Sequence, residues 1–190
     1  MTLPKLYAII DVRCFSDFSI EAFAHDLSAA GVSLIQYRNK SGNTAEMLRH
    51  CRELRRHFPK SRLIMNDRAD LCVAAGMDGV HLGQDDLSPE GARRVVGKGL
   101  WVGISTHSLE QVRQADRNSV DYIAIGPVFT TRSKANPDPA IGLEGIQSAR
   151  LITRKNCCSV IAAGADSVAV ISDLLDTPRQ SAEEFLRLMR

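Results

Sequence analysis

Short apolar runs alternate with longer amphipathic segments along the chain, and this rhythm constrains the fold more than any other feature. The apolar runs predict strands at Leu6–Ile10, Ser33–Tyr37, Arg62–Asn66, Gly79–Leu82, Trp101–Ile104, Tyr122–Gly126 and Ser167–Ile171. Apolar residues recur at helical spacing between them, at Ser19–Ala30, Thr44–His57, Pro89–Val96, Ser108–Ala115 and Gly142–Thr153. Strands repeatedly followed by helices are typical of parallel α/β folds, so the sequence predicts a (β/α)8 TIM-barrel type.

The expected barrel lacks one strand. Seven strands can be counted, whereas a closed barrel of this type has eight. Between the helix ending near Lys155 and the strand at Ser167, residues 156–166 leave room for one short helix and its turn. The chain therefore lacks the seventh strand, and its open sheet edges would be costly unless they are covered or paired.

Composition favours one domain over residues 1–190, because a chain of this length with 44% hydrophobic residues can bury a substantial core. The 24 basic and 22 acidic side chains leave a formal charge of +2, which provides no overall field for nucleic acid or membrane. No apolar run approaches the roughly 18 residues that cross a bilayer. The five cysteines form no C-x-x-C pair, and with no leader segment they indicate packing residues in a reduced, cytoplasmic protein.

Polar residues and glycines gather where the predicted strands end. They are Asp11, Arg38–Lys40, Asn66–Arg68, Gly83–Asp86, Ser105–His107 and Gly126-Pro127. In a parallel βα fold the carboxyl ends of the strands form one face, so these loops are expected to converge on one site.

The residue types in these loops suit a phosphate and a divalent cation. Arg38 and Lys40 lie two positions apart, so extended geometry would turn both to the side of Gln36. Asp67 and Asp86 follow neighbouring strands and could hold Mg²⁺, which favours a few carboxylates together with water and phosphate oxygens. The nearby acids have simpler explanations, because Asp70 would complement a helix dipole and Asp85 would face solvent.

The segment after the sixth predicted strand, residues 126–134, offers hydroxyls, backbone N–H groups and one cation that could close over a phosphate. Among the histidines, His81 is expected to pack inside the barrel or orient a neighbour. His107 is the better acid–base candidate, with a structural hydrogen bond as the equal alternative. His25, His50 and His57 lie on predicted helices and are expected at the surface.

Together these motifs resemble the thiamine phosphate synthase family. The matching stretches are Q-Y-R-N-K at 36–40, N-D-R at 66–68, V-H-L-G-Q-D-D at 80–86, G-I-S-T-H-S at 103–108, G-P-V-F-T-T-R-S-K at 126–134 and A-A-G-A-D-S-V-A-V-I-S at 162–172. The resemblance implies a Mg²⁺-dependent transferase that joins a pyrimidine methyl pyrophosphate to a thiazole phosphate, through a dissociative mechanism, and releases pyrophosphate. It also implies small-molecule substrates and, by family likeness alone, a homodimer.

The resemblance further implies a role for each matching residue. The pyrimidine pyrophosphate would contact Gln36, Tyr37, Arg38, Asn39, Lys40, Asn66, Ser105 and Lys134. Of these, Ser105 and Lys134 are the candidate catalytic residues, and Asp67 and Asp86 are the candidate metal ligands. The thiazole phosphate would contact Thr131, Arg132, Ser133, Ile171 and Ser172.

The pattern breaks where such synthases have a seventh strand ending in a glycine-rich G-G-I turn. Here the sequence passes from Arg154-Lys155 directly to Asn156-Cys157. A genuine deletion, a segment missing from the recorded sequence, and a degenerate paralogue that binds without turnover are the open alternatives. A related thiazole tautomerase is the less favoured enzyme, because it has no need of Asp86 or of a lysine for pyrophosphate.

Overall fold

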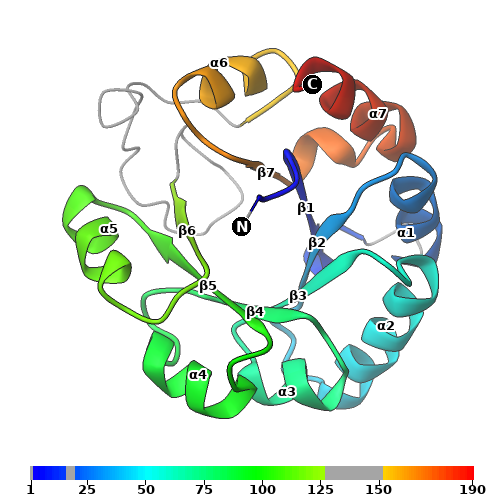
Figure 1. Ribbon diagram of the computed structural model, residues 1–190. Helices are drawn as coiled ribbons and strands as arrows, with labels where there is room; N and C mark the ends of the chain where they lie inside the picture. Colours follow the sequence, from blue (N-terminus) through cyan, green and yellow to red (C-terminus); the bar gives the residue numbers. More distant parts are fainter. Residues whose placement is uncertain (1, 16–19, 127–151) are drawn as a thin grey trace.

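A computed structural model describes residues 2–15, 20–126 and 152–190, which form one curled parallel sheet with helices on its outer side (Figure 1). The strands are β1 (Leu6–Asp11), β2 (Leu34–Arg38), β3 (Arg62–Asn66), β4 (Gly79–Leu82), β5 (Trp101–Thr106), β6 (Tyr122–Ile125) and β7 (Val168–Val170). Their order in the sheet is β6-β5-β4-β3-β2-β1-β7, and every pair is parallel. The expected α/β architecture of the TIM-barrel type is confirmed.

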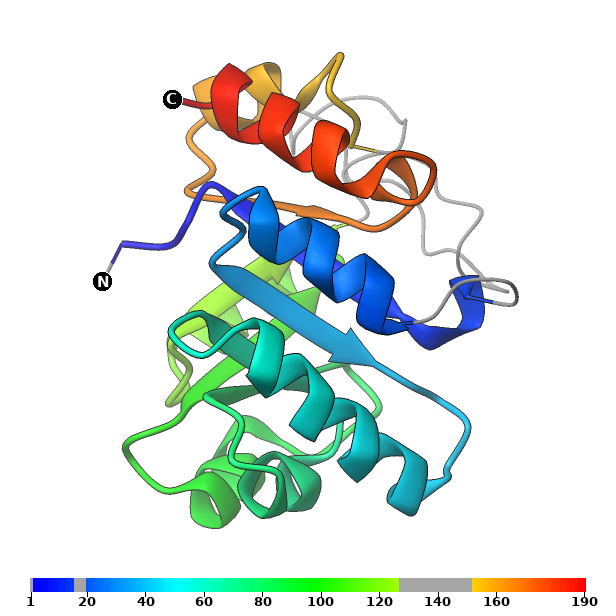
Figure 2. The same ribbon diagram turned by 90° about the vertical axis from the view of Figure 1, so that its right-hand side faces the viewer.

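Seven α-helices connect or follow these strands in the described part of the chain. They are α1 (Ile20–Ala29), α2 (Thr44–His57), α3 (Ala69–Ala74), α4 (Pro89–Val96), α5 (Leu109–Asp116), α6 (Cys157–Ala162) and α7 (Pro178–Leu188). Two short 3₁₀ helices, η1 (Val12–Cys14) and η2 (Ser172–Leu174), follow β1 and β7. Figure 2 shows α7, α1 and α2 side by side on the outer surface.

Local signals explain why several helices begin where the sequence predicts. The side chain of Asn43 accepts a hydrogen bond from Glu46 N at the start of α2, and Ser88 caps α4 in the same way ahead of Pro89. Only the last two residues of the helix expected at Gly142–Thr153 lie among the described residues, and neither is helical. Between Asn156 and Asp166 the chain forms α6 and a turn, as expected, without a strand.

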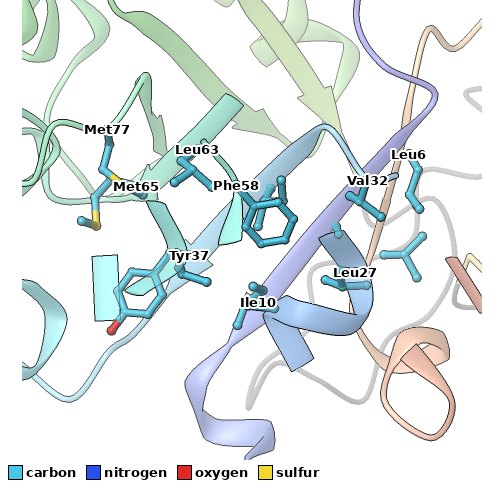
Figure 3. Close-up of a cluster of buried hydrophobic side chains, with 14 of the residues drawn as sticks. Leu6, Ile10, Leu27, Val32, Tyr37, Phe58, Leu63, Met65 and Met77 are labelled. Atoms are coloured by element: carbon cyan, nitrogen blue, oxygen red, sulfur yellow. The ribbon is translucent and has the colours of Figure 1, made fainter. Parts of the chain in front are cut away.

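The main core lies between the sheet and the helices. Alternate strand residues such as Ile10 and Leu63 point outward and pack against helix residues such as Leu27, and all three are fully buried (Figure 3). Burying each such side chain contributes about 1.5–3 kcal/mol. Cys51, Cys72 and Cys157 are buried in this cluster, while Cys14 and Cys158 are exposed, and all five are free thiols.

The inner side of the sheet carries a smaller and more polar core. Tyr7, Leu34, Ile64 and Tyr122 form its buried cluster, with Trp101 packed against it. Gly103 on β5 makes this arrangement possible, because a Cβ atom there would overlap the ring of Tyr122. No helix in the described part of the chain is both long enough and apolar enough to span a membrane.

Gly103→Ala should therefore destabilise the fold by about 1–3 kcal/mol, because the added methyl group must displace a buried ring. Urea unfolding of the variant and the parent protein measures this difference. Gly99→Ala is the matched control, since nothing lies within 4 Å of a Cβ atom at that position. Equal stability of the two alanine variants would contradict the packing described for Tyr122.

Candidate active site

The carboxyl ends of β2, β3, β4 and β5 bring together the residues that the motifs single out. Arg38 and Asn66 are the last residues of β2 and β3, and Ser105 is the penultimate residue of β5. Pairing sets Asn66 opposite His81 on β4, a few residues before the loop that carries Asp86. The expected convergence of these loops is confirmed for the described residues.

Arg38 is held at the strand end by an ion pair with Asp11 on the neighbouring strand β1. Arg13 also binds this carboxylate, with Nη2 2.8 Å from Oδ2. Burial by itself would raise the pKa of Asp11, but hydrogen bonds from Arg13 and the charge of Arg38 outweigh it, so the pKa is lowered. The Asp11 carboxylate therefore stays ionised and fixes the Arg38 guanidinium, which remains 17% exposed.

Lys40, Asp67 and Asp86 form a second charged group, in the segments that follow β2, β3 and β4. Lys40 Nζ lies 2.5 Å from Asp67 Oδ2. Burial raises the pKa of Asp67, Lys40 lowers it and the adjacent Asp86 raises it, and the net shift is upward. Two carboxylates and one ammonium leave this group with excess negative charge, which a divalent cation would neutralise.

The backbone around the two carboxylates is adapted to hold them. Asp67 has φ of +62°, a left-handed conformation that Asp tolerates better than most residues, and it is the one non-glycine example among the described residues. Its N–H donates to the carbonyl of His81 over 2.8 Å. Asp86 accepts a hydrogen bond from Gly83 N at 2.7 Å, and a Cβ atom on Gly83 would lie 2.9 Å from the same oxygen. Both aspartates are therefore positioned by the main chain.

Asn66 carries an unused donor at this site. It is 7% exposed, and its Nδ2 is buried without a hydrogen-bond partner in the described ranges 2–15, 20–126 and 152–190. A buried unpaired amide nitrogen costs about 1–3 kcal/mol, which a ligand acceptor would recover. Asn39 is equally buried, but its side chain is bonded to Tyr37 Oη, Glu46 and Ser41 N. The amide of Asn66 therefore has a donor that a ligand could use, whereas the amide of Asn39 is bonded within its own loop.

Ser105 and Gln36 are positioned from within the barrel. Ser105 Oγ lies 2.8 Å from His81 Nε2, and Gln36 Nε2 donates to Tyr7 Oη over 2.8 Å. Burial lowers the pKa of His81 to about 4, against a smaller opposing effect of Asp86. His81 is therefore a neutral, packed residue that orients a neighbour, as the sequence suggests.

Tyr37 does not face the same side as Gln36 and Arg38. Its ring is fully buried in the outer core, and its hydroxyl lies 2.8 Å from His50 Nδ1 on α2 (Figure 3). The expectation that His50 lies at the surface is wrong, because this bond draws it into the protein to 8% exposure. His25 is exposed, as expected, and His57 is half-buried. His107 makes a structural hydrogen bond from Nδ1 to the carbonyl of Gly126.

The thiazole side of the expected site is only partly visible. Thr131, Arg132, Ser133 and Lys134 lie outside the described residues. Ile171 and Ser172 lie at the carboxyl end of β7, where η2 begins. The next residue, Asp173, binds Arg154 with Oδ2 3.1 Å from Nε, and this ion pair ties η2 to the chain before α6.

The donor set at Asp67 and Asp86 suits Mg²⁺, because two carboxylates that are already close together leave positions for water and phosphate oxygens. Across the ranges that the structure describes, one group of three potential ligands has its ligand atoms within 4.8 Å of one another, namely Glu21, Glu53 and His57. That group lies on α1 and α2, on the outside of the barrel. The acids Asp70 and Asp85 are exposed, and Asp70 is paired with Arg68.

Sequence reasoning missed the partners that hold the site. Asp11 was expected only among the strand-end residues, although it anchors Arg38. The sequence places Tyr7 and Tyr122 only within predicted strands, whereas in the structure each carries a buried hydroxyl inside the barrel. Polar aromatic residues at inward positions of strands are the one signal that could have identified them.

Comparison with known proteins identifies a family. The family pattern described as thiamine monophosphate synthase matches residues 6–174. A thiamine-phosphate synthase of Koribacter versatilis (strain Ellin345) is 55% identical and covers 100% of this chain and 97% of the relative. One of Chloroflexus aurantiacus is 35% identical, over 88% of this chain and 83% of the relative. A solved thiamine phosphate pyrophosphorylase from Pyrococcus furiosus superposes with a TM-score of 0.86 and 29% identity, covering 97% of this chain and 95% of that chain.

The buried state of His81 predicts a pH-dependent stability. Because the pKa is near 4 in the folded protein and near 6.5 in the unfolded chain, the unfolded state takes up the proton first as the pH falls. Between pH 7 and pH 4, the parent should lose about 3 kcal/mol of unfolding free energy relative to His81→Gln. Denaturant titrations of both proteins across this range measure the difference. Parallel pH profiles would contradict the burial of a neutral imidazole.

Proposed function

The chain belongs to the thiamine monophosphate synthase family, and from this premise we propose that it condenses 4-amino-2-methylpyrimidine methyl pyrophosphate with a thiazole phosphate. The products are thiamine phosphate and pyrophosphate. The observation that carries the proposal is the cluster at the ends of β2, β3 and β4. It combines the cations Arg38 and Lys40, the carboxylates Asp67 and Asp86, and the unpaired amide of Asn66.

Pyrophosphate is the substrate group that these side chains suit. Arg38 and Lys40 supply positive charge, and Asn66 Nδ2 supplies a donor that has no partner among the described residues. Ser105, at the end of β5, supplies a hydroxyl beside them. Gln36 lies on the same inner side of β2, and Tyr37 and Asn39 support the strand and its loop without facing the substrate. Lys134 is assigned to the same anion by its motif alone.

Mg²⁺ is the proposed cofactor, held by Asp67 and Asp86. When bound, it would neutralise negative charge on the departing pyrophosphate oxygens. Two neighbouring groups already hold these carboxylates in position. Lys40 balances part of the charge on Asp67, and Gly83 N holds the Asp86 carboxylate in place.

The reaction needs charge stabilisation more than proton transfer. The bond between the pyrimidine methylene carbon and the pyrophosphate oxygen breaks, and both electrons leave with the oxygen. The resulting pyrimidine methyl cation then accepts the lone pair of the thiazole nitrogen, which forms the new C–N bond. Arg38, Lys40 and Ser105 stabilise the charge that develops on the leaving oxygen, and no proton has to move.

The thiazole phosphate is assigned to Thr131, Arg132, Ser133, Ile171 and Ser172. Supporting this placement, Ile171 and Ser172 lie at the carboxyl end of β7, on the face of the sheet where the other strands end. The alignment with the Koribacter relative runs over 205 positions against 190 residues in this chain, a difference of 15. That length fits a missing strand and turn.

Two further expectations stay predictions. One is a homodimer, which would cover the open edge of the sheet, and the other is a cytoplasmic location.

Incubation of the purified protein with both substrates and Mg²⁺ tests this function. We expect thiamine phosphate and pyrophosphate to form in equal amounts. Tight binding of the pyrimidine pyrophosphate without product would instead indicate a non-catalytic paralogue, and conversion of a thiazole tautomer alone would indicate a tautomerase.

Asp86→Asn should lower kcat by about 100-fold or more, because one of two carboxylates for the cation is lost. It should also abolish the rise in melting temperature that Mg²⁺ with inorganic pyrophosphate gives the parent. Asp85→Asn is the matched control, since the neighbouring Asp85 is exposed and should leave both effects intact. A Mg²⁺ response that survives in Asp86→Asn would remove Asp86 from the metal site.

Asn66→Ala and Asn39→Ala should affect stability to different extents, although both residues are 7% exposed. Asn66→Ala removes an unpaired donor and should change the unfolding free energy by less than about 1 kcal/mol, while raising the KM for the pyrimidine pyrophosphate. Asn39→Ala breaks several hydrogen bonds and should cost about 1–3 kcal/mol. Urea unfolding and substrate titrations measure the two effects. An unchanged KM in Asn66→Ala would exclude Asn66 as a substrate contact.

A further inference from the structure

A continuous series of hydrogen bonds crosses the inside of the barrel and joins two residues of the proposed site. Gln36 Nε2 donates to Tyr7 Oη over 2.8 Å, and Tyr7 Oη lies 2.9 Å from Tyr122 Oη. Tyr122 Oη lies 3.0 Å from His81 Nδ1, and His81 Nε2 lies 2.8 Å from Ser105 Oγ. These five residues, here called the interior chain, come from five different strands.

The middle of the interior chain is sealed from solvent. Tyr7, His81 and Tyr122 are 5%, 7% and 9% exposed, and their rings pack against one another, with His81 stacked on Tyr122 at a centroid distance of 5.5 Å. Buried polar atoms need partners, so these residues must satisfy one another. Burial also raises the pKa of both tyrosines, and each therefore keeps its single hydroxyl proton.

The direction of donation follows from the Gln36 end. An amide nitrogen can only donate, so Tyr7 Oη accepts there and gives its own proton to Tyr122 Oη. Tyr122 in turn gives its proton to His81 Nδ1. A neutral imidazole that accepts at Nδ1 carries its proton on Nε2, so His81 donates to Ser105 Oγ.

We propose that Tyr7, Tyr122 and His81 are positioning residues. They orient the hydroxyl group of Ser105 so that it donates a hydrogen bond to the departing pyrophosphate. Because Ser105 Oγ already accepts from His81, its own proton is directed away from the imidazole and is available to the site. Ser105 is only half-buried, and Gln84 Nε2 fixes its main chain by donating to its carbonyl at 2.5 Å. A donor oriented in advance costs no reorganisation as charge develops. This inference rests on the proposed function through the role of Ser105.

The tautomer of His81 tests the direction in the unmodified protein. In ¹⁵N-labelled protein at neutral pH, the shifts of His81 should show a protonated Nε2 and an unprotonated Nδ1. Protonation at Nδ1 would make His81 the donor to Tyr122 Oη and leave Nε2 to accept from Ser105, which would overturn the proposal. This measurement needs no variant and no turnover, so it stands even if the proposed function fails.

Tyr122→Phe tests the connection, because it removes the hydroxyl that joins Tyr7 to His81 and keeps the ring. Without a donor at Nδ1, the preference for one tautomer should be lost and the two ¹⁵N shifts should move toward each other. Tyr37→Phe removes a hydroxyl that is also buried, but in the outer core, and should leave the His81 shifts unchanged. Parent-like His81 shifts in Tyr122→Phe would overturn the proposal.

A double-mutant cycle separates positioning from a merely structural role. Tyr122→Phe should lower kcat about tenfold or more while changing the KM for the pyrimidine pyrophosphate less than about threefold. In the Ser105→Ala background, the same substitution should change kcat less than about twofold, because Ser105 is the residue through which Tyr122 acts. Equal losses in both backgrounds would overturn the positioning role. Absence of product from the parent protein would refute the proposed function and the role of Ser105 together, while the His81 shifts would still report whether the interior chain is ordered as described.

Discussion

Parallel pairing of β2, β3, β4 and β5 is the constraint on which the site depends. It sets all four carboxyl ends on one face, so that Arg38, Asn66 and Ser105 converge although 67 positions separate the first from the last. The loops that follow then need only a few residues each to add Lys40, Asp67 and Asp86. Charge is the second requirement, since the cations are held by Asp11 and Asp67 before any substrate arrives. The fold thus gathers cations and carboxylates that suit the proposed pyrophosphate and Mg²⁺.

The two sides of the sheet differ in character: the outer side is a hydrophobic core, and the inner side is a hydrogen-bonded polar cluster. The outer side packs aliphatic residues against helices, and the buried Tyr37–His50 pair belongs to that side. The inner side holds Tyr7, His81 and Tyr122, whose polar atoms are satisfied by one another and lead to Ser105. The packing of the inner side depends on Gly103, because the ring of Tyr122 occupies the space that a side chain at this position would need.

Much of the sheet was predictable because its strands are short apolar runs with polar ends. The bounds Arg62–Asn66 and Gly79–Leu82 were predicted to the residue, and α2 and α4 likewise, since their caps and proline are local signals. The roles of individual side chains were harder to predict from the sequence. Asn39 and Asn66 are of the same type and equally buried, one just after β2 and the other at the end of β3. Only their neighbours in the described structure show that the first is satisfied and the second is not. His50 was misplaced because its partner, Tyr37, lies 13 residues away on another element. The final helix α7 was not anticipated, although Pro178 begins it and its apolar residues recur at helical spacing.

We propose that the ends of β2, β3 and β4 form the pyrophosphate half of a thiamine phosphate synthase site. A crystal structure of the protein with Mg²⁺ and inorganic pyrophosphate would show whether they do. We expect the metal ion between Asp67 and Asp86, and a pyrophosphate oxygen within hydrogen-bonding distance of Asn66 Nδ2. Pyrophosphate bound away from these strand ends, with Asn66 Nδ2 still unpaired, would rule out the proposed site.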